Sequence, residues 1–161
     1  MFCKIKTKLI EIINGFTNVI RWFPVIWKDR DWDNSYMWEI LNFKLRNMEH
    51  FLSSDKTVCI HPESRLQRLK EARMITDRLL DDDYGIDEMV KIKQKYDAEH
   101  TFIDLKDGSG LKQMEIIVKN GTKEDFDKEM QRNRERQEYL RKQDLERLGY
   151  LLTKYSDDWW D

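Results

Sequence analysis

The residues best suited to chemistry lie in one short segment, WFPVIWKDRDWD, which runs from Trp22 to Asp33. It combines three tryptophans with one lysine, one arginine and three aspartates. Tryptophan rings can stack on a nucleobase, and basic side chains can hold its phosphates. The segment therefore predicts a pocket for a small nucleotide ligand, whose candidate binding residues are Arg21, Trp22, Trp27, Lys28, Arg30 and Trp32.

The same tryptophans also have a structural interpretation. Trp22, Trp27, Trp32 and Trp38 follow one another at spacings of five, five and six residues, which fit no single helix face. Tryptophan buries a large apolar area but keeps an indole N–H that needs a partner. The segment can thus form a corner with rings packed inward and charges outside, and this interpretation is favoured over the pocket.

The alternating aspartates raise the question of a divalent cation. Asp29, Asp31 and Asp33 match positions 1, 3 and 5 of a calcium-binding EF-hand loop. That loop requires glycine at position 6 and glutamate at position 12, where this chain has Asn34 and Ile40. The three aspartates are therefore weak metal candidates, and helix capping with ion pairing to a nearby arginine is favoured.

Other signatures of catalysis are missing from the sequence. His50, His61 and His100 are scattered, and no serine or cysteine lies in a nucleophile motif. Paired Cys/His spacings typical of structural zinc are missing as well. The sequence predicts no catalytic residue and no cofactor, and it favours a binding protein over an enzyme.

Length and composition predict a single domain spanning residues 1–161 with a modest core. Of the 161 residues 40% are hydrophobic and 37% charged, and the net charge of −2 gives no reason to expect general nucleic-acid binding. The first thirty residues hold six basic and two acidic residues, a local charge of +4. Without a cleavable leader or an apolar run of about 18 residues, we expect a soluble cytoplasmic protein with no membrane contact.

Hydrophobic periodicity predicts a mainly α fold, a bundle of about five helices. The first expected helix, residues 4–20, is amphipathic, and packing of its apolar side in the core is favoured over an interfacial membrane anchor. A break or kink is expected near residues 22–25, because of Pro24. Three further helices are expected within residues 35–52, 62–80 and 86–96. The first two of these carry apolar stripes, namely Trp38, Leu41, Leu45, Met48 and Leu52, and Leu66, Leu69, Ala72, Ile75 and Leu79. The apolar side of the first helix consists of Ile5, Leu9, Ile12, Phe16 and Val19.

The last third of the chain differs in character. Two β-like runs flank KDGSG and predict a small β-hairpin near residues 101–118. A long charged helix follows from Thr122, which with Asp125 resembles a capping box. Between residues 122 and 147 it carries eight basic and eight acidic residues, so we expect it to be exposed and to project or to pair with another chain.

Two remote segments, RWFPVIWKDRDWDNSYMWEILNFKLRNMEHFL and QDLERLGYLLTKYSDDWWD, together resemble a family of small proteins encoded by tailed bacteriophages. That family shares the W-F-x-V-I-W-x-D-R-D-W-D core, an E-I-L-x-F-K-L helix and a terminal W-W-D. The match covers about a third of the chain. It implies a viral gene expressed in the cytoplasm of a host bacterium and implies no reaction.

The pairing of two Trp/Asp-rich motifs suggests that the two ends of the chain meet. We expect Trp159 and Trp160 to pack on the corner formed by residues 22–38, and Trp38 to share this structural role. Losing such large aromatics would destabilise the fold.

The leading functional hypothesis is a phage accessory protein that binds a host component stoichiometrically, for example in counter-defence. Its target would be a host protein, bound along residues 124–147, or a small nucleotide, bound by residues 21–33. One alternative is a metal-assisted phosphoesterase using Asp29, Asp31 and Asp33, with Glu39 as a further ligand. The other is a virion or assembly component that forms a homo-oligomer through the long helix.

Overall fold

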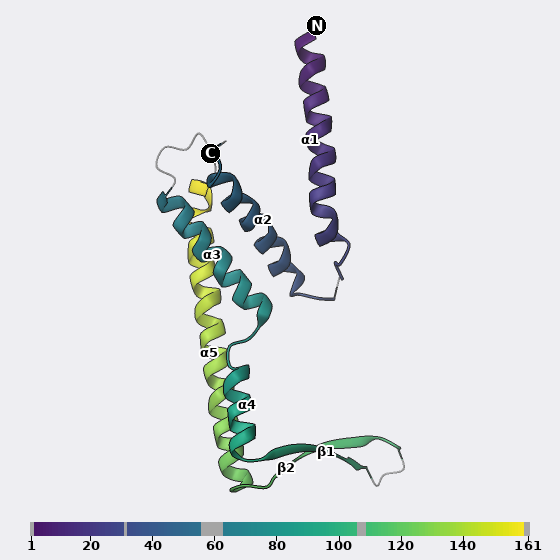
Figure 1. The fold of residues 1–161 in the computed structure, drawn as a ribbon, viewed down its shortest axis with the longest axis vertical. Coiled ribbons are helices and arrows are strands. Elements are labelled where there is room, and N and C mark those ends of the chain that lie inside the picture. Colours follow the sequence, from purple (N-terminus) through teal and green to yellow (C-terminus); the bar gives the residue numbers. More distant parts are fainter. Residues whose placement is uncertain (1, 31, 56–62, 106–108, 160–161) are drawn as a thin grey trace. The chain divides into compact units, whose positions relative to one another are not determined.

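The computed structural model describes residues 2–30, 32–55, 63–105 and 109–159 (Figure 1). As predicted, the fold is mainly helical with one small antiparallel hairpin. In chain order the elements are α1 (Phe2–Ile26), α2 (Tyr36–Leu52), α3 (Glu63–Asp81), α4 (Ile86–Lys95), β1 (Ala98–Asp104), β2 (Lys112–Val118), α5 (Lys123–Tyr155) and the short 3-10 helix η1 (Ser156–Trp159).

Internal contacts divide the chain into two compact units. Unit 1 comprises residues 1–80 and 150–161, and thus holds α1, α2, most of α3 and the end of the chain. Unit 2 comprises residues 81–149, and holds α4, the hairpin and most of α5.

Helix α1 of unit 1 departs from two predictions. It continues through Pro24 to Ile26, so the expected break is wrong (Figure 1). Pro24 lies in the last turn, where its missing N–H removes one hydrogen bond from a helix end rather than from the middle. The expected core packing is also wrong, because the side chains from Lys6 to Ile20 are all exposed. The side chain of Ile5 lies outside the described residues.

The apolar stripes predicted for α2 and α3 are confirmed. Leu45 and Leu52 of α2 are buried, and so are four residues spaced by three or four along α3, namely Leu69, Ala72, Ile75 and Leu79. The spacing places these side chains on one face of each helix, which is what core packing requires. Leu151 and Trp159 at the end of the chain are buried within the same unit.

Unit 2 is organised around the predicted hairpin. Strands β1 and β2 pair antiparallel, from Ala98 opposite Val118 to Asp104 opposite Lys112. Two strands are marginal alone, and here the paired ends nearest the helices pack on a buried cluster of Ile92, Tyr96 and Phe126. The expected turn at KDGSG lies partly outside the described residues.

Helix α5 begins at the predicted cap, where the Asp125 N–H donates to the Thr122 hydroxyl over 3.2 Å. It extends past Gly149 to Tyr155 without interruption. Its charged faces are exposed, but Phe126 and Asn133 are buried. One stripe of the charged helix therefore packs inside unit 2, which its composition alone did not indicate.

Candidate functional site

The tryptophans of the predicted nucleotide pocket have different neighbours in the structure. Trp22 packs edge-on against Phe43 of α2, with ring centroids 4.8 Å apart. Trp27 lies against Phe23, its neighbour one turn earlier, and remains 72% exposed. Trp32 is 83% exposed. The rings therefore point to separate surroundings, which is not the arrangement that sandwiches a base.

The charged residues of that segment lie at the surface. Lys28 and Arg30 are exposed, and the Arg30 guanidinium donates to the neighbouring Asp29 carbonyl over 2.7 Å. Backbone N–H groups of Lys28 and Asp29 close a turn onto Val25 and Ile26. This turn ends α1 and leaves the basic side chains in solvent.

The proposed metal ligands are engaged differently. Asp33 accepts hydrogen bonds from the Ser35 hydroxyl at 2.6 Å and from the Ser35 N–H at 2.9 Å. These two bonds hold the pKa of the Asp33 carboxyl below its ordinary value. Asp31 lies outside the described residues, and within the described part of the chain no three His, Cys, Asp or Glu side chains are grouped to hold a metal ion. Asp33 thus orders the turn that precedes α2.

Trp159 lines a cavity in unit 1. It is 4% exposed, and its indole N–H has no hydrogen-bond partner within the described residues. The cavity, of about 360 Å³, is also lined by Arg21, Lys44, Asn47, Met48, Phe51 and Leu52. The end of the chain therefore lies beside α2 and the last turns of α1. Trp38 is half-buried, Trp160 lies outside the described residues, and joint packing of Trp159 and Trp160 on the tryptophan corner stays a prediction.

A polar network between α2 and α3 was missed by the sequence analysis. The buried Asn42 amide donates to the Thr76 hydroxyl and to the Asp77 carboxylate, both at 2.8 Å. Its oxygen accepts from Arg46 at 2.7 Å. Arg73 bridges the Glu49 carboxylate at 2.6 Å and Asp77 at 2.5 Å. The spacing of Asn42, Arg46 and Glu49 on one side of α2 is the signal the sequence offered, but their partners lie more than twenty residues away.

The network determines the titration of Asp77. Partial burial raises the pKa of this carboxyl, whereas hydrogen bonds from Arg46 and Asn42 and the charges of Arg46 and Arg73 lower it. The lowering effects prevail, so the pKa of Asp77 lies below its ordinary value. A carboxylate held by two arginines and an amide is a structural clamp between helices rather than a general acid or base at neutral pH.

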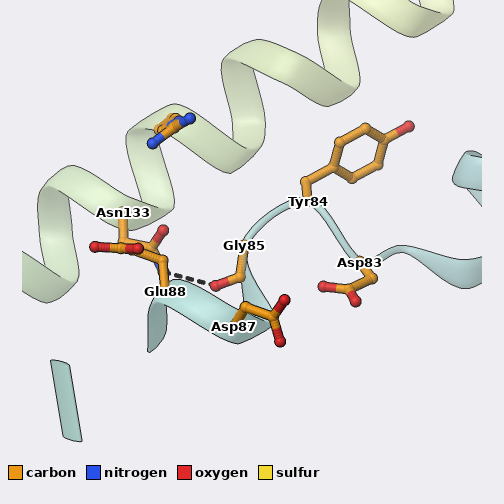
Figure 2. A pocket seen from close by; sticks show the side chains of 7 residues that line it. Asp83, Tyr84, Gly85, Asp87, Glu88 and Asn133 are labelled. Atoms are coloured by element: carbon orange, nitrogen blue, oxygen red, sulfur yellow. Dashed lines mark hydrogen bonds between the residues drawn. The ribbon is translucent and has the colours of Figure 1, made fainter. Parts of the chain in front are cut away.

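A second cavity, in unit 2, surrounds the start of α4 (Figure 2). The buried Asn133 side chain donates to the Gly85 carbonyl over 3.1 Å. A Cβ at position 85 would lie 2.8 Å from both the Asn133 oxygen and Gln137, so one of these side chains would have to shift. The lining residues are Asp83, Tyr84, Gly85, Asp87, Glu88, Asn133 and Arg136.

This acidic cavity does not provide a coordination site. Figure 2 shows the carboxylates of Asp87 and Glu88 on opposite sides of the helix start, so they do not converge. Asp83 accepts from the Ile86 N–H at 3.1 Å, as a capping residue does. The cavity therefore marks a close contact between the start of α4 and α5, at a glycine.

An uncovered apolar surface lies on α1. Most of the exposed apolar residues of this helix share one side, since successive residues turn by about 100°, and Ile10 is exposed outside that side. Phe16, near the middle of this side, is 67% exposed. We call this surface the α1 apolar face, and within the described side chains it consists of Leu9, Ile12, Ile13, Phe16, Val19, Ile20 and Phe23, all exposed.

The contacts of α1 with the rest of unit 1 leave this face uncovered. Trp22 and Val25 are the half-buried residues of α1, and they lie on other sides of the helix. Trp22 packs on Phe43, and the Val25 carbonyl accepts the Tyr36 hydroxyl over 2.7 Å. Helix α1 is thus attached by its last turns, and the α1 apolar face points elsewhere.

No protein-family model, curated protein or solved structure matches this chain. The α1 apolar face is the candidate functional site, because an exposed apolar surface is suited to binding a partner.

Proposed function

We propose that this protein is a binding protein that acts stoichiometrically on a component of its host cell, and that the α1 apolar face is its recognition surface. The main support is the exposure of a continuous row of large aliphatic and aromatic side chains on a helix whose Trp22 and Val25, near its end, contact α2. Soluble proteins rarely leave such contiguous apolar patches uncovered unless a partner binds them.

The energetic reason is direct. Transfer of apolar surface out of water is favourable by roughly 25 cal/mol per Å². The side chains of the α1 apolar face do not gain this within unit 1, where Phe16 and Ile20 keep most of their surface in solvent. A partner that covers them supplies the missing stabilisation, and the helix is already formed to receive it.

The resemblance to tailed-bacteriophage proteins supports a host component as the target, and counter-defence is one process such binding would serve. A nucleotide signal is less well supported, because Trp27 and Trp32 face solvent separately. The phosphoesterase alternative gains nothing from Asp33, which is occupied by Ser35.

Site-specific photo-crosslinking in living bacteria tests this proposal. A benzoylphenylalanine in place of Phe16 lies within the α1 apolar face, and the same residue in place of Asn14 lies on the opposite, exposed side of the same helix. We expect the label at position 16 to form a covalent adduct with a host protein or lipid, and the label at position 14 to form much less. Equal labelling from both positions, or none, would overturn the proposal.

A further inference from the structure

We infer that the partner of the α1 apolar face is the surface of a negatively charged lipid bilayer, on which α1 lies with its axis parallel to the membrane plane. This inference rests on the proposed function and names its target. It replaces the expectation of no membrane contact, which depended on α1 packing into the core.

The distribution of residues around α1 is that of an interfacial helix. With a turn of about 100° per residue, the α1 apolar face covers an arc of about 120° that no polar residue interrupts. The opposite side carries Glu11, Asn14, Asn18 and Arg21, all exposed. A helix with two such sides can bury one in the acyl boundary and keep the other in water.

Charge complementarity favours an anionic lipid surface. Lys6 and Lys8 precede most of the α1 apolar face, and Arg21, Lys28 and Arg30 lie at or beyond its other end. All five side chains are exposed. The first thirty residues have a local charge of +4 although the whole chain has −2, so the positive charge gathers where the apolar surface is. Basic residues of this kind are attracted to anionic headgroups.

Trp27 adds a further indication at the boundary. It directly follows α1 beside Lys28, and its ring is 72% exposed. Tryptophan prefers the interface between lipid and water because its large ring is apolar while its N–H is polar. Its place at the end of the apolar row suits a helix that lies at headgroup depth.

The polar side of α1 decides between lying on the bilayer and crossing it. The segment Lys6–Ile26 is long and apolar enough to span a membrane, and none of it is buried. A single crossing helix, however, would place Glu11, Asn14 and Asn18 in hydrocarbon, where charged and polar groups are costly. The parallel orientation keeps the same residues hydrated.

The attachment of α1 to unit 1 is compatible with this orientation. Trp22 and Val25 hold the helix to α2 from sides other than the α1 apolar face. Insertion of Phe16 and Ile20 among lipid chains therefore breaks no described contact with α2.

Vesicle flotation of the full-length protein tests the inference. The probes are vesicles of phosphatidylcholine alone and of phosphatidylcholine mixed with phosphatidylglycerol. We expect binding to the anionic vesicles to be at least roughly tenfold tighter and to weaken with added salt, as electrostatic attraction does. Two variants with the same change in charge are compared, Ile13→Glu with Phe16→Glu on the apolar face and Asn14→Glu with Asn18→Glu on the polar side.

The apolar-face variant should lose anionic-vesicle binding by at least roughly tenfold relative to the polar-side variant, since only it removes apolar burial. Both should keep the circular dichroism spectrum and melting temperature of the parent, because all four side chains are exposed. Equal loss in both variants, or no flotation of the parent, would overturn the inference. Bound parent that resists alkaline carbonate would overturn the parallel orientation in favour of spanning.

The two proposals can fail separately. If the label at position 16 forms an adduct only with a protein in cells and the protein does not float with vesicles, the membrane inference fails and the proposed binding function stands. No adduct and no flotation remove both.

Discussion

Helices α1 and α3 have similar apolar periodicity in the sequence, yet the apolar side is buried in α3 and exposed in α1, within the same unit. Leu69 of α3 is fully buried, whereas Phe16 of α1 is 67% exposed. Spacings of three and four residues state that one side of a helix is apolar. They do not state what covers that side. The difference shows that a regular apolar stripe does not by itself distinguish a helix face buried in the core from an exposed face that binds a partner.

The sharpest way to break this comparison is to truncate both side chains. Leu69→Ala should lower the free energy of unfolding by about 2–5 kcal/mol, because it removes buried methyl groups and leaves a cavity. Phe16→Ala should change it by less than about 0.5 kcal/mol, because the ring makes little contact within the unit. Urea denaturation followed by circular dichroism measures both. Comparable losses would show that α1 is packed in solution.

A smaller effect is expected from the polar clamp that joins α2 to α3. Asp77→Asn should cost about 1–3 kcal/mol at neutral pH, since it removes the carboxylate that pairs with Arg46 and leaves Arg73 paired with Glu49 alone. The exposed Asp81 near the end of the same helix provides the matched control, Asp81→Asn, with little expected change.

The pH dependence of that difference has a defined sign. The folded pKa of Asp77 is lowered, so its contribution is present above the unfolded value of 3.8 and is lost as pH falls through the lower folded pKa. The parent should therefore lose its advantage over Asp77→Asn only in this acidic window. An advantage unchanged down to the most acidic pH at which the protein stays folded would contradict the assignment.

A last comparison makes the same substitution, glycine to alanine, at two positions. Gly85→Ala should destabilise unit 2 by about 1–3 kcal/mol, because the added methyl group would overlap the Asn133 side chain. Gly15→Ala places its methyl group in open space on α1 and should raise local helix stability by up to about 1 kcal/mol. Thermal melts and far-ultraviolet circular dichroism distinguish the two. Equal responses would mean that the contact at Gly85 yields easily.

Local patterns predicted most of the elements. The stripe of α3 predicted its buried side, the run up to KDGSG predicted β1, and Thr122 predicted the start of α5. These features depend on neighbours within a few residues, which the sequence displays directly. The predicted break at Pro24 was wrong, because this proline lies in the last turn of α1 and the helix ends only two residues later.

What the sequence could not supply is the meeting of distant residues. Asn42 finds Thr76 thirty-four positions away, and Gly85 meets Asn133 forty-eight positions away. The predicted binding segment stays a prediction: Trp22 packs on Phe43 and Trp27 on Phe23, and Trp32 is exposed. Asp33 accepts hydrogen bonds from Ser35, two positions further on, but Ser35 itself is the N-cap of α2 and makes no side-chain capping bond, so Asp33 orders the preceding turn instead of capping the helix.

The attachment of α1 by its last turns has an evolutionary consequence. Residues such as Phe16 carry no volume constraint from a packed interior, so substitutions among leucine, isoleucine, valine and phenylalanine are neutral to folding there. A fluid bilayer accepts any of them, whereas a shaped protein groove accepts few. If the partner is a lipid bilayer, related sequences should vary in side-chain volume at these positions but keep hydrophobic residues. If the partner is a protein, side-chain volume at these positions should be conserved.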